Sequence, residues 1–231
     1  MELLSIHGID VPLVPKEVSS VIWQALISGD YEAKEARLII KAVKPGDRVL
    51  ELGSGIGIIT SIIAKIEGTS VWAFEANPST ALLGLRVIEA NHLDNVVFSQ
   101  GLLTSGEPRT FRFYVREDLW MSSMDEKQGT YEEVIEVTSA NIDGFISQHR
   151  INALVMDIEG AERDLLQHAE LPGIERIFLE LHDHLYGLSG IRDISHALGL
   201  KGYAYDPRGS RGPCILFNKD EAQREYDPDI S

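Results

Sequence analysis

Short apolar runs alternate with amphipathic segments along most of the chain. The runs predict buried strands at residues 49–52, 70–76, 95–100, 153–160 and 176–181, the fourth of which ends in two acids. Between them, apolar residues at helical spacing predict helices at residues 58–66, 77–91, 141–149, 161–169 and 191–200. Strands that are apolar almost throughout, each followed by a helix, are typical of a parallel sheet that is covered on both faces.

The end of the main domain departs from this alternation. Two further strands are predicted at residues 202–205 and 214–218, and only a turn-rich stretch with Pro207, Gly209, Gly212 and Pro213 separates them. Because no helix connects them, we expect them to pair as an antiparallel hairpin at the edge of the sheet. The predicted fold is therefore α/β, Rossmann-like and doubly wound, with seven mostly parallel strands and an antiparallel C-terminal hairpin.

Segments at both ends of the chain lie outside this pattern. Residues 1–43 predict a short N-terminal helical extension, with helices at residues 16–28 and 31–43. Residues 44–219 form the predicted main domain, and the charged tail at residues 220–231 is expected to fray.

An insert interrupts the main domain at about residues 109–138. Within it, residues 110–115 and 132–138 alternate like two paired strands, and a mostly polar loop joins them. We expect this insert and the first 28 residues to shape an acceptor pocket.

Three glycines follow the first strand at two-residue spacing: Gly53, Gly55 and Gly57. Glycine permits positive φ and lets a ligand approach the backbone closely. The helix that begins directly afterwards offers unpaired N–H groups to a polar ligand. The strand, the turn and the helix together predict a cofactor cradle.

The residues around these glycines indicate which cofactor is bound. A dinucleotide fold requires a glycine three residues after Gly55, where this chain has Ile58. Glu51 would repel a pyrophosphate but suits an ammonium or a sulfonium, and Glu75 ends the second strand, where it can accept ribose hydroxyls. S-adenosylmethionine meets these conditions, with S-adenosylhomocysteine as the product. The predicted cofactor-binding residues are Glu32, Glu51, Gly53, Ser54, Gly55, Gly57, Glu75, Ala76, Asn77 and Asp157.

Three side chains at strand ends are the candidate catalytic residues: Asp157, Glu159 and His182. Asp157 and Glu159 are two residues apart on a strand and leave the same face, at the carboxyl end where such sheets bind ligands. A neutral His182 could accept the proton of an acceptor hydroxyl during methyl transfer. The alternative is that the two acids cap the next helix, a role that suits Glu162 better. A divalent metal on these three residues is an option that the spacing allows but does not require, so none is expected.

The composition limits which binding partners and which surroundings are expected for this chain. Lys and Arg number 21 against 36 Asp and Glu, a net charge of −15, which opposes binding to nucleic acid or anionic lipid. The single cysteine, Cys214, excludes an internal disulfide and a cysteine-based zinc site. No membrane span and no secretory signal are expected, so the sequence predicts a cytoplasmic protein.

The same motifs resemble a known family. Residues 44–57 and 74–78 resemble class I S-adenosylmethionine-dependent methyltransferases. Residues 154–162, LVMDIEGAE, are similar to the K-x-D-x-E-G-x-E segment of the FkbM family, with a departure at Leu154, near a position where the family often has lysine. Further similarity lies in the pair Tyr31-Glu32, in Trp120 with Ser122-Ser123, in residues 137–142 and in residues 180–182, so the resemblance covers about residues 29–217.

The resemblance implies methyl transfer to hydroxyl groups of sugars, polyketides or other small molecules, without naming the acceptor. Two other functions stay open at this point: a non-catalytic binding module on the same scaffold, and an NAD-dependent oxidoreductase, which Ile58 and Glu51 disfavour. A homodimer would follow if the insert and the N-terminal residues formed an apolar patch.

Overall fold

The computed structural model describes residues 4–118 and 121–219. Trp120 and the tail at residues 220–231, on both of which the sequence carried predictions, lie outside the described residues. Within the described ranges, no helix combines the length and the apolar character that crossing a membrane would require.

A seven-stranded sheet forms the centre of the molecule, with the strand order β11-β12-β10-β9-β3-β4-β5. Five strands are parallel: β3 (Arg48–Leu52), β4 (Ser70–Glu75), β5 (Val96–Gln100), β9 (Ala153–Met156) and β10 (Arg176–Glu180). β12 (Cys214–Lys219) pairs antiparallel with both β10 and β11 (Tyr203–Arg211), which confirms the predicted hairpin. The chain builds β3, β4 and β5 outward and then returns to β9 on the other side of β3. A ligand crevice is expected at this reversal.

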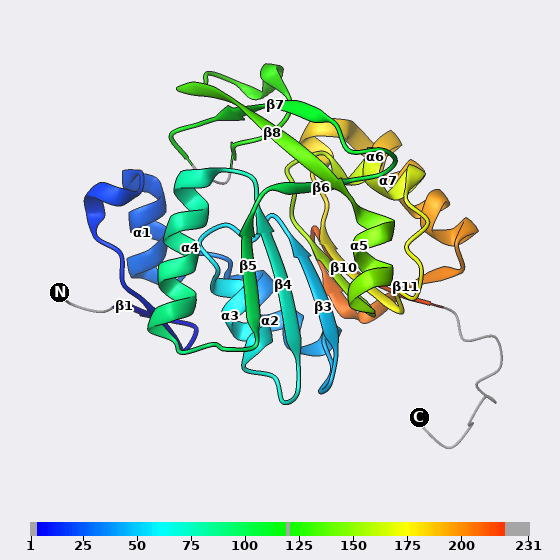
Figure 1. Ribbon diagram of the computed structural model, residues 1–231, viewed down its shortest axis with the longest axis horizontal. Coiled ribbons are helices and arrows are strands. Elements are labelled where there is room, and N and C mark those ends of the chain that lie inside the picture. The colour runs from blue at the N-terminus through cyan, green and yellow to red at the C-terminus, as the bar shows by residue number, and fades with distance from the viewer. Residues whose placement is uncertain (1–3, 119–120, 220–231) are drawn as a thin grey trace.

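Helices cover both faces of the sheet (Figure 1). α2 (Ala33–Ala42), α3 (Ile58–Ala64) and α4 (Pro78–Ala90) lie on one face, and α5 (Ile142–His149), α6 (Glu162–His168) and α7 (Asp183–Leu200) lie on the other. Successive residues of β3 divide between the two cores, since Val49 packs with α2 and α3 whereas Leu50 and Leu52 pack with α5, α6 and α7. This alternation follows from the two-residue period of a strand.

The N-terminal segment is more than the helical extension that was predicted. It begins with a hairpin, β1 (Leu4–Ile6) and β2 (Ile9–Val11), followed by a 3-10 turn at Pro15–Glu17 and then α1 (Ser20–Ser28). α1 starts later than predicted because the Ser19 hydroxyl caps it by accepting the Ile22 N–H at 3.2 Å. Buried side chains of this segment pack against Ile56, Ile58 and Val87 in a third core beside the glycine turn.

α2 also starts later than predicted, at Ala33. Glu32 adopts a left-handed conformation with φ 50°, which a helix interior does not accept. Tyr31 and Glu32 therefore form a turn ahead of α2, and both line the main cavity of the protein.

The insert forms a separate three-stranded sheet, which lies above the carboxyl ends of the central strands (Figure 1). β7 (Thr110–Val115) and β8 (Glu133–Asn141) pair antiparallel from Thr110 opposite Thr138 to Val115 opposite Glu133, as predicted. The sequence did not predict β6 (Leu102–Thr104), which pairs in parallel with the end of β8.

Two C-terminal elements are longer than predicted. α7 begins at Asp183 instead of residue 191, with a kink at Gly187, where φ is 62° and ψ is −177°. β11 continues to Arg211 through a register shift between Asp206 and Arg211. The glycine and proline content that indicated a loop is accommodated by this irregular part of the strand.

Candidate active site

A cavity of about 350 Å³ opens at the carboxyl ends of β3, β4 and β9, beneath the insert. Its cofactor-side wall consists of Tyr31, Glu32, Leu52, Gly53, Gly55, Phe74, Glu75 and Ala76. The opposite wall comes from the insert, from the turn after β9, from α6 and from the first turn of α7. It includes Phe111, Phe113, Met124, Asp125, Gln128, Glu159, Asp164 and Leu185. The cavity lies at the predicted reversal of strand order.

The turn after β3 requires glycine at its first position. Gly53 has φ 79°, and a Cβ on it would lie 1.7 Å from the Asp157 carbonyl oxygen. The N–H groups of Gly53 and Ser54 both donate to the Phe74 carbonyl, at 2.9 and 3.0 Å. The turn is thus held against both neighbouring strands, with its backbone exposed to the cavity.

Glu75 supports the same turn from the end of β4. Its carboxylate accepts the N–H of Gly55 at 2.9 Å and the N–H of Asn77 at 2.8 Å. Burial raises the pKa of Glu75 to about 7, although the hydrogen bonds from Asn77 and Gly55 oppose this rise. Each carboxylate oxygen has a second lone pair, so Glu75 can still accept ribose hydroxyls while it holds the turn.

Glu51 faces a different space from the one that the sequence suggested. It does not line the main cavity but a small adjoining one of about 20 Å³, which has room for about one water molecule. Its carboxylate accepts the Thr60 hydroxyl at 2.5 Å, and burial raises its pKa to about 8. Glu32 lines both cavities, and its Oε2 atom is buried without a hydrogen-bond partner among the described residues.

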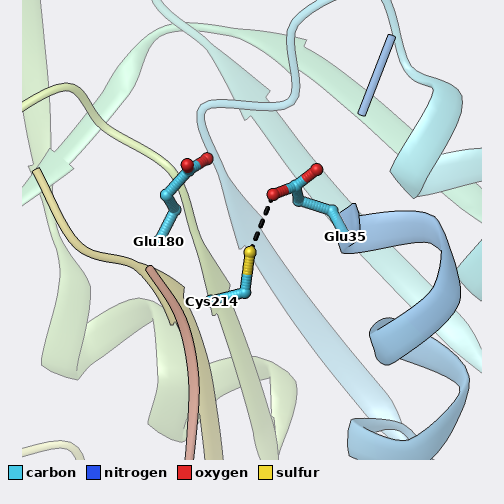
Figure 2. Close-up of side chains that lie close together, drawn as sticks. All are labelled: Glu35, Glu180 and Cys214. Carbon is cyan, nitrogen blue, oxygen red and sulfur yellow. Dashed lines mark hydrogen bonds between the residues drawn. The ribbon is translucent and has the colours of Figure 1, made fainter. Parts of the chain in front are cut away.

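The small cavity borders a cluster that the sequence did not single out. Figure 2 shows Glu35 and Glu180 beside Cys214, whose thiol donates a hydrogen bond to Oε1 of Glu35 at 2.8 Å. Ligand atoms of these residues all lie within 4.8 Å of one another. Burial, followed by the hydrogen bond to Glu35, raises the pKa of the Cys214 thiol far above its ordinary value. The thiol therefore remains a protonated donor, whereas a metal would require the thiolate.

His182 lies among three carboxylates behind the wall of the main cavity. Its Nε2 is 3.3 Å from Oδ1 of Asp157 and 3.5 Å from Oε2 of Glu159. Its Nδ1 is 3.1 Å from Oε1 of Glu162. Burial by itself would lower the pKa of His182, but the nearby carboxylates of Asp157 and Glu162 outweigh it and raise the pKa to about 11. The ring is therefore a cation at neutral pH, and a cation cannot accept the proton of an acceptor.

Glu162 is fully buried and organises the turn after β9. Its carboxylate accepts the N–H of Ile158 at 3.1 Å and the N–H of Gly160 at 3.0 Å. It therefore holds the turn before α6 instead of capping the helix, the role that the sequence had suggested. Within this turn, Glu159 has φ 51° and Gly160 has φ 100°. The left-handed conformation at Glu159 is held by the bonds on either side of it.

The insert contacts this turn directly. Gln128 donates from Nε2 to the Glu159 carbonyl oxygen at 3.0 Å, while Ser123 donates to Oε1 of the same amide. Burial, followed by the charge of Asp157, raises the pKa of Glu159 to about 8. The insert thus fixes the backbone of an acid whose proton exchanges near neutral pH.

The structure brings together most of the predicted site residues. Of these, Glu32, Gly53, Gly55, Glu75, Ala76, Asp157 and Glu159 line the main cavity. Ser54, Gly57 and Asn77 support its wall without lining it, Glu51 faces the small cavity, and His182 lies behind Asp157. The sequence did not identify Phe111 or Phe113 individually, because the alternation of β7 does not show which face meets the cavity. It also missed Gln128, which lies in the polar loop between β7 and β8.

Three features define a class I methyltransferase fold: the sheet with its reversed final strand, the glycine turn after β3 and the acid that ends β4. Residues 51–205 match the methyltransferase FkbM domain, which is more than half of the 231 residues. The chain belongs to this family and carries its S-adenosylmethionine-dependent methyltransferase domain. Family membership argues against the oxidoreductase alternative.

Two solved structures and one curated relative illustrate the similarity. Trm5b from Pyrococcus abyssi is 16% identical, with a TM-score of 0.52 over 94% of this chain and 55% of that one. Aeropyrum pernix fibrillarin, solved with natively bound S-adenosylmethionine, is 12% identical, with a TM-score of 0.45 over 80% of this chain and 74% of that one. The ribosomal protein L11 methyltransferase of Bacillus cytotoxicus is 34% identical over 61 residues, 26% of this chain and 20% of that protein. The chain thus spans about half of Trm5b and matches a fifth of the curated relative. At 16% identity, the likeness to Trm5b supports the fold alone.

Proposed function

We propose that the protein transfers the methyl group of S-adenosylmethionine to a hydroxyl oxygen of a small molecule. The observation that carries this proposal is the position of Asp157 and Glu159, which lie in one cavity between the glycine turn and the insert. Because the cofactor cradle and the insert form opposite walls, an acceptor under the insert would face the donor across these two carboxylates. Proximity and alignment of two bound reactants supply much of the rate enhancement of such a reaction.

The cofactor is proposed to lie along the wall formed by Gly53, Gly55 and Glu75. Glu75 would accept the ribose hydroxyls, and the unpartnered Oε2 of Glu32 would accept the methionine ammonium. Burial, followed by the charge of Asp157, raises the pKa of Glu32 well above its ordinary value, so a bound ammonium would restore its charged form. The exposed turn at Gly53 lets the ligand approach the backbone.

Bound S-adenosylmethionine supplies a methyl group on a positively charged sulfur, a good leaving group. As the acceptor oxygen forms its bond to the methyl carbon, the bond from sulfur to that carbon breaks, and its electron pair stays on sulfur. The acceptor proton passes to the Glu159 carboxylate, whose pKa of about 8 suits a base near neutral pH. The cationic His182 would hold Asp157 and Glu159 in place, a positioning role instead of the base role that the sequence suggested.

The test combines binding with transfer. Wild-type protein, Glu75→Gln and Glu159→Gln are titrated with S-adenosylmethionine by calorimetry and then incubated with hydroxylated metabolites and a donor labelled at the methyl group. Glu75→Gln is expected to weaken cofactor binding, and Glu159→Gln to slow transfer with binding unchanged. Label recovered on nitrogen or carbon instead of oxygen, established by NMR of the product, would contradict O-methylation.

A further inference from the structure

We propose that the acceptor carries a protonated amine near its hydroxyl group, and that the site rejects phosphorylated and carboxylated molecules. This inference rests on the proposed function, since it assigns the insert side of the cavity to the acceptor. Three observations support it: the side chains that line this wall, the pairing of cations around the site, and the occupied backbone donors of the turn into α6.

Every charged side chain that lines the acceptor side is an acid. Glu159 lies in the wall, with Asp125 and Asp164 exposed toward the rim. Neither cavity has a lysine or an arginine among its described lining residues. The cofactor, with one net positive charge, meets separate acids on its own side, Glu32 and Glu75. The acids of the acceptor side therefore remain available to a second cation.

Two arginines next to lining residues in the sequence or in space are engaged by other groups. The terminal nitrogens of Arg116 donate to the carbonyls of Tyr114, Met121 and Asp125 and to the Ser123 hydroxyl. Arg163 pairs with Asp193. His182 is one cation among the carboxyl groups of Asp157, Glu159 and Glu162, so three acids already share it. A phosphate or a carboxylate in the cavity would meet these acids without a cationic partner of its own.

The backbone donors that could bind an anion are also occupied. The turn into α6 offers the N–H groups of Ile158 and Gly160, the kind of donors that hold phosphates in other folds. Here both donate to the buried carboxylate of Glu162, at 3.1 and 3.0 Å. On the other wall, the N–H groups of Gly55 and Asn77 donate to Glu75. The chain's own carboxylates thus fill the positions that an acceptor phosphate would use.

The acceptor wall also has an apolar part. Phe111 and Phe113 of β7 and Leu185 of α7 line it. Such a wall suits a carbon skeleton, and aromatic rings attract a cation through their faces. Since an ammonium is the group that both the acids and the rings would bind, the chemistry of this wall favours a hydroxylated amine.

Three probes with the same skeleton test the inference: 2-phenylethylamine, 2-phenylethanol and phenylacetate. Their affinities for the protein saturated with S-adenosylhomocysteine are measured by ligand-observed NMR. We expect the amine to bind at least about fivefold more tightly than the alcohol, as one partly buried ion pair would give, and phenylacetate to bind most weakly. Binding of phenylacetate equal to that of the amine, or no binding of the amine, would overturn the inference.

Matched variants locate the preference. Asp164→Asn and Glu159→Gln should each reduce the ratio of amine to alcohol affinity, whereas Glu89→Gln, an exposed acid on α4, should leave it unchanged. An unchanged ratio in both site variants would also overturn the inference. Calorimetry with S-adenosylmethionine on the same samples separates the two proposals. A protein that does not bind the cofactor fails the proposed function, and one that binds it without preferring the amine fails only this inference.

Discussion

The buried carboxylate of Glu162 lies 3.1 Å from Nδ1 of His182, and the same carboxylate accepts the two backbone N–H groups of the turn after β9. One side chain thus holds the conformation of that turn and, after Asp157, helps to raise the pKa of the histidine. Asp157 and Glu159 contact the other ring nitrogen, so the candidate catalytic acids are positioned through Glu162 without contact to it.

Glu162→Gln is expected to destabilise the fold by about 3 kcal/mol, because it removes one partner of a buried charged pair. It should also lower the pKa of His182, which NMR of the ring protons can follow. In the wild type, the pKa of folded His182, about 11, exceeds the ordinary value of 6.5. The stability that the protonated ring contributes to the fold is therefore complete below pH 6.5 and is lost as pH rises toward 11. Denaturant unfolding over this pH range, with Glu133→Gln as the exposed control, checks the prediction. A His182 pKa that does not move would show that Glu162 does not set its charge.

Gly53→Ala should abolish cofactor binding and destabilise the protein by more than about 3 kcal/mol, since the added Cβ would overlap the Asp157 carbonyl oxygen. Gly199→Ala is the matched control, because nothing lies within 4 Å of its added Cβ and it stands in α7. That change should stabilise slightly, by about 0.5 to 1 kcal/mol. Thermal unfolding and calorimetry measure both effects, and equal behaviour of the two variants would refute the crowding argument.

The transfer rate should rise with pH. The base form of Glu159 accumulates as pH rises through its pKa of about 8, so the rate should increase about tenfold per pH unit below that value and level off above it. The positive charge of the bound cofactor should move the midpoint somewhat lower. Single-turnover rates at fixed cofactor saturation give the profile. Glu159→Gln should remove the dependence of the rate on pH. An unchanged pH profile in this variant would show that Glu159 is not the base.

Gln128→Leu should slow transfer by about tenfold while leaving cofactor affinity unchanged. The change keeps the size of the side chain but removes its hydrogen bond of 3.0 Å to the Glu159 carbonyl. Lys127→Ala, at an exposed neighbouring position, serves as the control. Separate measurements of kcat and of the cofactor dissociation constant distinguish a positioning role from loss of folding, which would lower both.

The cofactor side of the site could be predicted largely from the sequence, because local patterns determine it. Both signals can be read from neighbouring residues in the sequence: the glycine spacing after one strand and the acid that ends the next. Gly53 and Glu75 do line the cavity. The N-terminal hairpin was missed because its strands are only three residues long. Such strands are too short for alternation to distinguish them from a loop.

The acceptor side depends on contacts between distant segments, so the sequence could not supply it. The raised pKa of His182 follows from Asp157 and from Glu162, which lies 20 positions earlier and reaches it only through the packing of α6 beside α7. Likewise, Phe111 and Phe113 become cavity residues only because β6 and β8 hold the insert above β9. Glu51 was placed correctly in the strand, but the Thr60 hydroxyl draws it away from the main cavity.

Tyr31 belongs both to the wall of the main cavity and to the third core, where it packs with the N-terminal hairpin and Ile56. Ligand binding and the folding of residues 4–31 are therefore thermodynamically linked, since each stabilises the conformation that the other requires. A protein filled with cofactor would hold its N-terminal segment more tightly against proteases than the empty form. Its lifetime in a cell would then depend on the supply of methyl donor.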